Sequence, residues 1–166
     1  MCNRSRPFPY KASMAGFSYV ELLVSVAILG LLATVAMPLA ETTVKRQKEA
    51  ELRIALREIR SGLDAYKQAA AAGKISTSIG DSGYPPTLIE LSAGVDDISH
   101  PGHRLYFLRR IPADPFASDK ALAAVDTWGK RGYATPPENP SEGDDVFDVY
   151  SRSTQVGLNG IPYKEW

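Results

Sequence analysis

The chain is poor in cysteine and histidine. This argues against a fold stabilised by a disulfide and against one stabilised by a zinc ion. It holds one cysteine, Cys2, and two histidines among 166 residues. A single cysteine cannot form a disulfide within its own chain. His100 and His103 lie three residues apart with Pro101-Gly102 between them and no cysteine nearby, which is typical of a loop rather than a zinc site.

Net charge and catalytic motifs are also missing. The 19 basic and 19 acidic residues cancel to a formal charge of zero, which is not the balance of a nucleic-acid-binding protein. The sequence contains no Gly-x-Ser-x-Gly elbow, no zinc-protease helix and no phosphate or dinucleotide loop. The pairs Asp96-Asp97 and Asp144-Asp145 stand beside glycine and proline and are interpreted as solvated turns. We therefore expect no enzymatic activity.

One uncharged apolar run dominates the N-terminal part. Residues 22–40 carry no charge, and about 20 apolar residues span the ~30 Å core of a bilayer as a helix. Glu21 stands at the start of the run. A carboxylate carried to membrane depth costs on the order of 2–3 kcal/mol. Glu21 is therefore either a functional residue or the last polar residue before the membrane, and its position leaves both readings open.

Residues 16–40 resemble the N-terminus of type IV pilin-like proteins. Gly16 precedes Phe17, Glu21 is fifth after the glycine, and the apolar run ends near Pro38. The resemblance implies that a prepilin peptidase cuts after Gly16 and that the new N-terminal Phe17 is N-methylated. It also implies that the apolar helices of many copies pack into a filament.

The resemblance divides the chain into four parts: a leader over 1–16, a transmembrane assembly helix over 17–40, an amphipathic helix over 41–72, and a periplasmic globular α+β region over 73–166. An ordinary signal peptide is cut after its apolar run, whereas here the cut precedes the run, so the mature chain stays anchored. Without the three bases of the leader, 16 bases stand against 19 acids, a formal charge of −3.

The charge count does not support the expected orientation. Six bases follow the run within about 20 residues, against three in the leader, and the positive-inside rule would place the larger number in the cytoplasm. The resemblance implies the opposite: a single-pass protein of the bacterial inner membrane with a cytoplasmic N-terminus and a periplasmic C-terminal domain. The bases after the run are Lys45, Arg46, Lys48, Arg53, Arg57 and Arg60.

Residues 17–72 are predicted to form one long helix. Gly30 and Pro38 interrupt its apolar half, and a proline removes a backbone donor and favours a kink. One interpretation is that neighbouring helices accommodate the proline in the membrane helix. The other, which the resemblance implies, is that the stretch between Gly30 and Pro38 unwinds on assembly. The second half is amphipathic, with an apolar stripe at Leu52, Leu56, Ile59, Leu63, Tyr66 and Ala70 and a solvated face at Arg53, Arg57, Glu58, Arg60, Asp64 and Lys67.

Two charged features of this second half have local interpretations. Glu49 and Arg53 are spaced as an i,i+4 ion pair. The cluster Lys45-Arg46-Lys48 is either part of a solvated helix face or a contact with anionic lipid or DNA.

The C-terminal part is predicted to be a small α+β region. Gly73 ends the long helix, and a short helix over 87–93 is capped by Thr87 and stopped by Gly94. Trp128-Gly129, Tyr133 and residues 146–151 are predicted strands of a small antiparallel sheet, separated by a loop over 135–145. Tyr163 and Trp166 are expected to pack back on the sheet or helix. The fold class is α+β and type IV pilin-like, with the long helix packed on the sheet.

The order of motifs in this part resembles the major, G-type pseudopilins of type II secretion systems. The motifs are Tyr84-Pro85-Pro86, residues 111–115, Trp128-Gly129 and residues 145–151. The resemblance implies a structural subunit of a secretion pseudopilus, with further copies of itself, the prepilin peptidase, minor pseudopilins and an inner-membrane assembly platform as partners. A pilin of a type IV, DNA-uptake or adhesive pilus is the alternative.

The same resemblance implies a structural calcium site in the loop after Tyr150-Ser151. Calcium takes six or more oxygen ligands, with carboxylates among them. Residues 152–160 contain no acid and begin with Arg152, so that Ser153, Thr154 and Asn159 offer only weak ligands. No cofactor is predicted, and Ca²⁺ stays an alternative with a poor ligand set.

Overall fold

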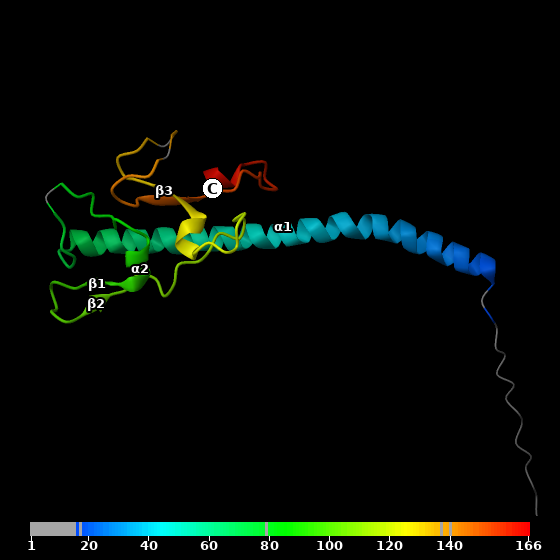
Figure 1. Ribbon diagram of the computed structural model, residues 1–166, viewed down its shortest axis with the longest axis horizontal. Helices are drawn as coiled ribbons and strands as arrows, with labels where there is room; N and C mark the ends of the chain where they lie inside the picture. The colour runs from blue at the N-terminus through cyan, green and yellow to red at the C-terminus, as the bar shows by residue number, and fades with distance from the viewer. Residues whose placement is uncertain (1–15, 17, 79, 137, 140) are drawn as a thin grey trace, which may run out of the picture. The chain divides into compact units, whose positions relative to one another are not determined.

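The computed structural model describes residue 16 and residues 18–78, 80–136, 138–139 and 141–166, with the backbone alone for residues 35–38. Its main element is the helix α1, Tyr19–Ala71 (Figure 1). The chain divides into two compact units, Met1–Thr42 and Thr43–Trp166. The prediction of one long N-terminal helix is confirmed.

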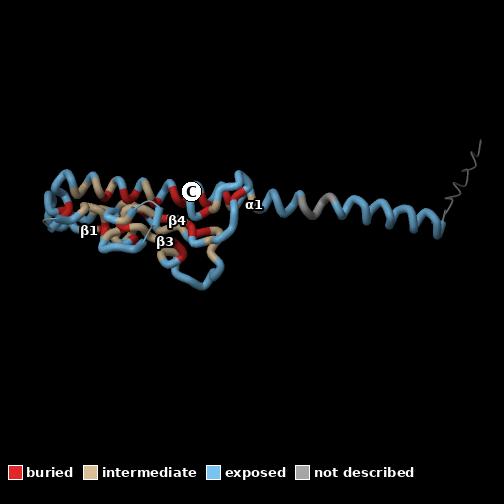
Figure 2. The backbone as a smooth tube through the Cα atoms, turned by 90° about the horizontal axis from the view of Figure 1, so that it is seen from above, coloured by how far each residue is buried: buried red, intermediate tan, exposed pale blue. Residues whose placement is uncertain are grey.

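The first unit contains the apolar half of α1. Every residue from 19 to 34 is exposed, and Figure 2 colours this stretch pale blue accordingly. The helix is long and apolar enough to cross a membrane. An all-round apolar helix is typical of a segment that lies in lipid or among other helices.

The second unit is built on the apolar stripe of α1. The predicted stripe is confirmed, because its first five residues are buried and Ala70 packs at the edge of the core. Gly73 ends the helix in a left-handed conformation, φ +69°, which glycine adopts without steric cost. The other buried apolar residues include Leu88, Leu91, Leu108, Trp128, Val146, Val149 and Tyr163.

Among the described residues, two small antiparallel sheets complete the second unit. β3, Trp128–Arg131, pairs with β4, Asp148–Ser151, in the register Trp128↔Ser151. This is the predicted sheet, although Tyr133 lies beyond the end of β3. The sequence did not predict the hairpin of β1, Val95–Asp96, and β2, Arg104–Leu105. The predicted α+β fold, with a long helix packed with small antiparallel sheets, is confirmed.

Three local predictions need correction. The short helix α2 is Ile89–Ala93, and its N-cap is Leu88 with no side-chain hydrogen bond, so Thr87 is not the cap. Gly94 does stop it, with φ +80°. Asp97 is buried rather than solvated. Hydrogen bonds from the Ser99 hydroxyl and amide, opposed by burial and helped by His100, lower the pKa of Asp97 to about 2.

The remaining short elements are two 3₁₀ helices. η1, Ala124–Thr127, leads directly into β3. η2, Tyr163–Glu165, follows the last loop and brings the C-terminal aromatic residues onto the core.

Candidate assembly site

The processing position lies at the edge of the described chain. Gly16 is described and exposed, whereas Phe17 and residues 1–15 lie outside the described residues. Glu21 stands in the first turn of α1, where a carboxylate interacts favourably with the positive end of the helix dipole. Its side chain is exposed and has no partner among the residues that the structure describes. The two residues therefore remain predicted processing and assembly positions.

Gly30 and Pro38 both lie inside α1, which is helical through each of them. A Cβ added at Gly30 would meet no described atom within 4 Å, so the folded chain itself does not require glycine there. Glycine also allows another helix to approach closely. Unwinding between Gly30 and Pro38 on assembly stays a prediction.

The amphipathic half of α1 is tied to the end of the chain by Glu49. Its Oε1 accepts the Leu158 amide at 2.7 Å and the Tyr163 hydroxyl at 2.9 Å. The predicted pair with Arg53 is therefore wrong, because Glu49 is buried and turned inward while Arg53 lies over the Trp166 ring at 4.4 Å. Sequence spacing offered a signal, since Glu49 precedes Leu52 by three positions and continues the apolar stripe.

Tyr163 is the buried partner in this bond. Its side chain is fully buried, stacks on Phe116 at 4.1 Å and meets Trp166 edge-on at 5.0 Å. Burial, followed by the hydrogen bond and negative charge of Glu49, raises the pKa of Tyr163. The prediction that Tyr163 and Trp166 pack back on the domain is confirmed.

Residues 156–162 form a closed turn that we call the C-terminal loop. An antiparallel bridge joins Val156 to Pro162, and the Gly157 amide donates to the Ile161 carbonyl at 2.9 Å. Lys45 of α1 donates to the Val156 carbonyl at 2.8 Å. The loop is therefore held both by its own backbone and by side chains of α1.

Arg60 joins α1 to β4 and to the last residue. Its Nε donates to Asp148 Oδ1 at 2.8 Å, and its Nη2 donates to the main-chain oxygens of Val149, at 3.2 Å, and Trp166, at 2.7 Å. Arg60 was predicted to lie on the solvated face, and this is a correction. Arg60 directly follows Ile59 and so lies at the edge of the apolar stripe. From there its side chain reaches β4 and the last residue.

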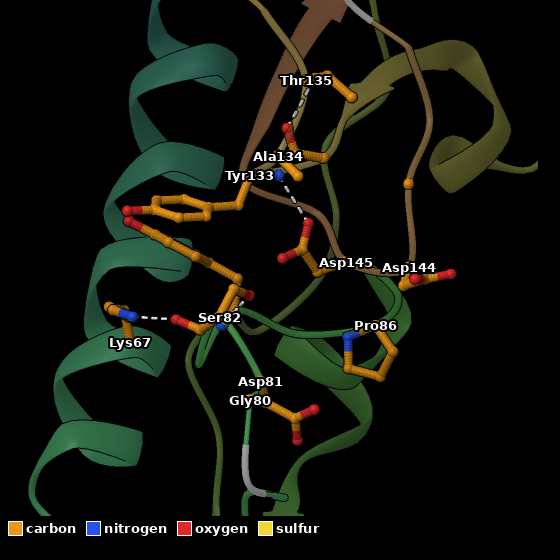
Figure 3. A pocket seen from close by; sticks show the side chains of 13 residues that line it. Lys67, Gly80, Asp81, Ser82, Pro86, Tyr133, Ala134, Thr135, Asp144 and Asp145 are labelled. Atoms are coloured by element: carbon orange, nitrogen blue, oxygen red, sulfur yellow. Dashed lines mark hydrogen bonds between the residues drawn. The ribbon is translucent and has the colours of Figure 1, made fainter.

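Lys67 is a second exception on that face. Figure 3 shows it beside a pocket of about 690 Å³, where it donates to the Ser82 carbonyl. Its ammonium lies 5.1 Å from the centre of the Tyr84 ring and 6.0 Å from that of Tyr133. Asp145 accepts the Tyr133 amide at 2.7 Å. These contacts give the pocket wall a structural role in fixing the loop before β4.

Comparison with known proteins gives two relatives. A protein of Klebsiella michiganensis is 29% identical over 128 residues, which cover 72% of this chain and 80% of the relative. A protein of Klebsiella pneumoniae is 28% identical over 138 residues, which cover 79% of this chain and 91% of the relative. Both are named type II secretion system core protein G. This chain is similar to core protein G over most of its length. The resemblance predicted from its motifs is confirmed.

No family model matches the chain, and no solved structure matches it significantly. The similarity to core protein G therefore rests on the two sequence matches.

The calcium site implied by the resemblance to core protein G does not fit the residues present. Ser153 and Thr154 line one surface pocket, whereas Asn159 lines another. The Ser153 hydroxyl accepts the Gln155 amide at 3.3 Å, and Asn159 Oδ1 accepts the Ile161 amide at 3.1 Å. No group of three or more His, Cys, Asp or Glu residues that could hold a metal occurs among the described residues. The three residues therefore do not line one common pocket among those of the described chain.

Proposed function

We propose that this chain is a pseudopilin, a structural subunit that polymerises through the apolar half of α1 into a type II secretion pseudopilus and so drives protein export. The observation that carries the proposal is that every residue from 19 to 34 is exposed, because an uncovered apolar helix needs lipid or other copies around it. The two relatives named core protein G support it. Since both are secretion proteins, neither favours the alternative of a type IV, DNA-uptake or adhesive pilus.

Assembly has to move this helix from lipid into a bundle of helices. Lipid tails are as apolar as the helix, so packing and polar contacts supply the preference for protein. Glu21 supplies such a contact if the amine freed on Phe17 of a neighbouring copy pairs with its carboxylate. A buried acid without a partner is costly, whereas a paired one is tolerated and fixes register. The pair would thus select one axial stagger between copies.

Processing and location follow from the same proposal. A prepilin peptidase cuts after Gly16 and methylates Phe17, which removes Arg4, Arg6 and Lys11 together with the only cysteine. The apolar helix then anchors the chain in the inner membrane with the second unit in the periplasm. Minor pseudopilins and the inner-membrane assembly platform are the partners that start and extend the filament. The chain acts as a building block and performs no catalysis.

Cysteine cross-linking in the native host tests the assembly step. The processed chain has no cysteine of its own, so a single Leu29→Cys substitution reports contacts between apolar helices without background. We expect a cross-linked dimer of otherwise unchanged chains, since one cysteine per chain can join only two copies. Adding Glu21→Ala or Glu21→Leu should leave membrane insertion intact and reduce the dimer yield and secretion roughly tenfold or more, since breaking a buried ion pair costs about 3–5 kcal/mol.

Two further variants control this experiment. Glu58→Ala removes an exposed acid of the same helix and should leave the yield of cross-linked dimer unchanged. Glu21→Asp keeps the charge and should retain part of the assembly. A full yield of cross-linked dimer and normal secretion from Glu21→Leu would refute the pairing of Glu21 with Phe17.

A further inference from the structure

The C-terminal loop presents three apolar side chains to solvent. Val156, Leu158 and Ile161 are 46%, 45% and 44% exposed. The backbone bridge from Val156 to Pro162 and the inward bond of the Leu158 amide to Glu49 fix the loop. Because these bonds fix the backbone of the loop, the three side chains stay exposed in the folded second unit.

The loop lies on the part of the second unit that follows the apolar run most closely in sequence. It is bound to Lys45 and Glu49. Lys45 is five residues after Ala40, the end of the run, and five residues of extended chain span at most about 18 Å. By contrast, exposed Ile98 is bound through its amide to Lys74, at the far end of α1. If the apolar run lies in a bilayer, the short segment from Ala40 to Lys45 keeps the C-terminal loop near that membrane surface.

Positive charge surrounds the attachment point. Arg46 is exposed and forms no side-chain bond with any described residue. Lys45 and Lys48 are each half-buried, and the Lys48 ammonium lies 5.8 Å from the centre of the Phe116 ring. Glu49 is buried and bonded to Leu158 and Tyr163, whereas Glu41 and Glu51 on either side are exposed. The segment 41–51 therefore carries three bases against two exposed acids, which leaves the surface beside the loop slightly basic as well as apolar.

We propose that the C-terminal loop and the bases Lys45, Arg46 and Lys48 form a foot that binds an anionic phospholipid surface while the subunit waits in the membrane. Val156, Leu158 and Ile161 enter the headgroup region, and the bases contact lipid phosphates. The foot would restrict the orientation of the second unit at the membrane surface before the subunit joins a filament. This proposal rests on the proposed function only in requiring that the apolar half of α1 is embedded in the membrane.

Fluorescence quenching in vesicles tests the foot on the full chain. In a Cys2→Ser background, Leu158→Cys carries an environment-sensitive dye, and the protein is reconstituted with lipids that bear a quencher near the headgroup. In vesicles containing phosphatidylglycerol we expect about twofold or more quenching relative to the same dye at Ile98→Cys, which is exposed at the other end of the unit. The excess should fall in pure phosphatidylcholine and at high salt.

Two charge variants test the contribution of the bases. Arg46→Gln should reduce the quenching at position 158, whereas Arg57→Gln, an exposed base further along α1, should leave it unchanged. Equal effects of the two substitutions would show that the bases of the foot are not specific contacts and would overturn that part of the proposal.

A third dye position separates this proposal from the proposed function. Leu31→Cys lies in the apolar run, and its dye should be quenched by lipids labelled deep in the acyl chains. If position 31 is quenched and position 158 behaves like position 98, the foot is wrong while membrane embedding stands. If position 31 is not quenched, the membrane-anchored subunit itself is wrong, and the foot falls with it.

Discussion

Glu49 and Tyr163 form a buried hydrogen bond of 2.9 Å between α1 and the last 3₁₀ helix, 114 positions apart in sequence. The same carboxylate oxygen accepts the Leu158 amide at 2.7 Å. One acid thus fixes both the C-terminal loop and the aromatic residue that follows it.

The Glu49–Tyr163 bond predicts a specific loss of stability. Glu49→Ala leaves the Tyr163 hydroxyl and the Leu158 amide without their partner, and each buried unsatisfied group costs about 1–3 kcal/mol. Tyr163→Phe removes one bond and should cost less. Urea unfolding of the full chain in detergent, followed by the fluorescence of buried Trp128, measures both. Glu51→Gln, an exposed neighbour, is the control, and an equal effect of Glu49→Ala and Glu51→Gln would contradict the anchoring role.

The Tyr163 pKa adds a pH dependence with a definite sign. The pKa is raised above its ordinary value of 10.0, so the folded state favours the neutral phenol. Its contribution is fully present below pH 10 and is lost as the pH rises through the raised value. In wild type the free energy of unfolding should fall in this alkaline range more steeply than in Tyr163→Phe.

Chelation provides a second test of the loop. Since Ser153 and Thr154 line a different pocket from Asn159 and residues 152–160 contain no acid, we expect the same thermal midpoint with EDTA and with millimolar Ca²⁺. Differential scanning calorimetry of the full chain in detergent measures this, with Mg²⁺ as the control for ionic strength. A midpoint that rises selectively with Ca²⁺, as binding to the folded state requires, would show that a calcium site exists.

Arg60 should be more sensitive to substitution than its neighbour Arg57. Lysine cannot reproduce the three bonds that the Arg60 guanidinium makes to Asp148, Val149 and Trp166. The side chain is 39% exposed, which weakens the ionic part. We expect Arg60→Lys to cost about 1 kcal/mol in urea unfolding, and Arg57→Lys, which loses no bond with the described residues, to cost nearly nothing. The reverse order would be inconsistent with Arg60 as the link to β4.

Gly129 should tolerate no side chain. A Cβ at this position would overlap the ring of Tyr150, its partner across the β3–β4 sheet. We expect Gly129→Ala to cost about 1–3 kcal/mol through overpacking. The same substitution in a Tyr150→Ala background should cost much less, and a double-mutant cycle measures the difference. Additive costs would show that the ring is not what excludes the side chain.

Periodicity made the long helix predictable. Leu52, Leu56, Ile59, Leu63 and Tyr66 recur at steps of three and four, which only a helix places on one face. The sheet of β3 and β4 could be located for a similar reason, since Trp128-Gly129 and residues 146–151 are separated by a loop rich in turn residues.

The side-chain anchors were not predictable in the same way. Glu49 was paired with Arg53 because local spacing shows only neighbours on the same helix, whereas its partners Leu158 and Tyr163 are more than 100 residues away. The β1–β2 hairpin escaped because two-residue strands carry too few positions to show alternation. The sequence does show that Glu49 lies in line with the apolar stripe. A charged residue at such a position, however, does not reveal its partner.

In the proposed function, cleavage after Gly16 is the step on which the mature N-terminus, its pairing with Glu21 and polymerisation all depend. Gly16→Leu should block it and leave the full-length precursor on a gel. Intact-mass spectrometry of the native protein purified from membranes measures it most directly. We expect a chain of residues 17–166 with one methyl group on Phe17 and no reaction with a thiol reagent, because Cys2 has been removed. A membrane-derived chain that still carries residues 1–16 and a reactive Cys2 would contradict the assignment as a processed pseudopilin.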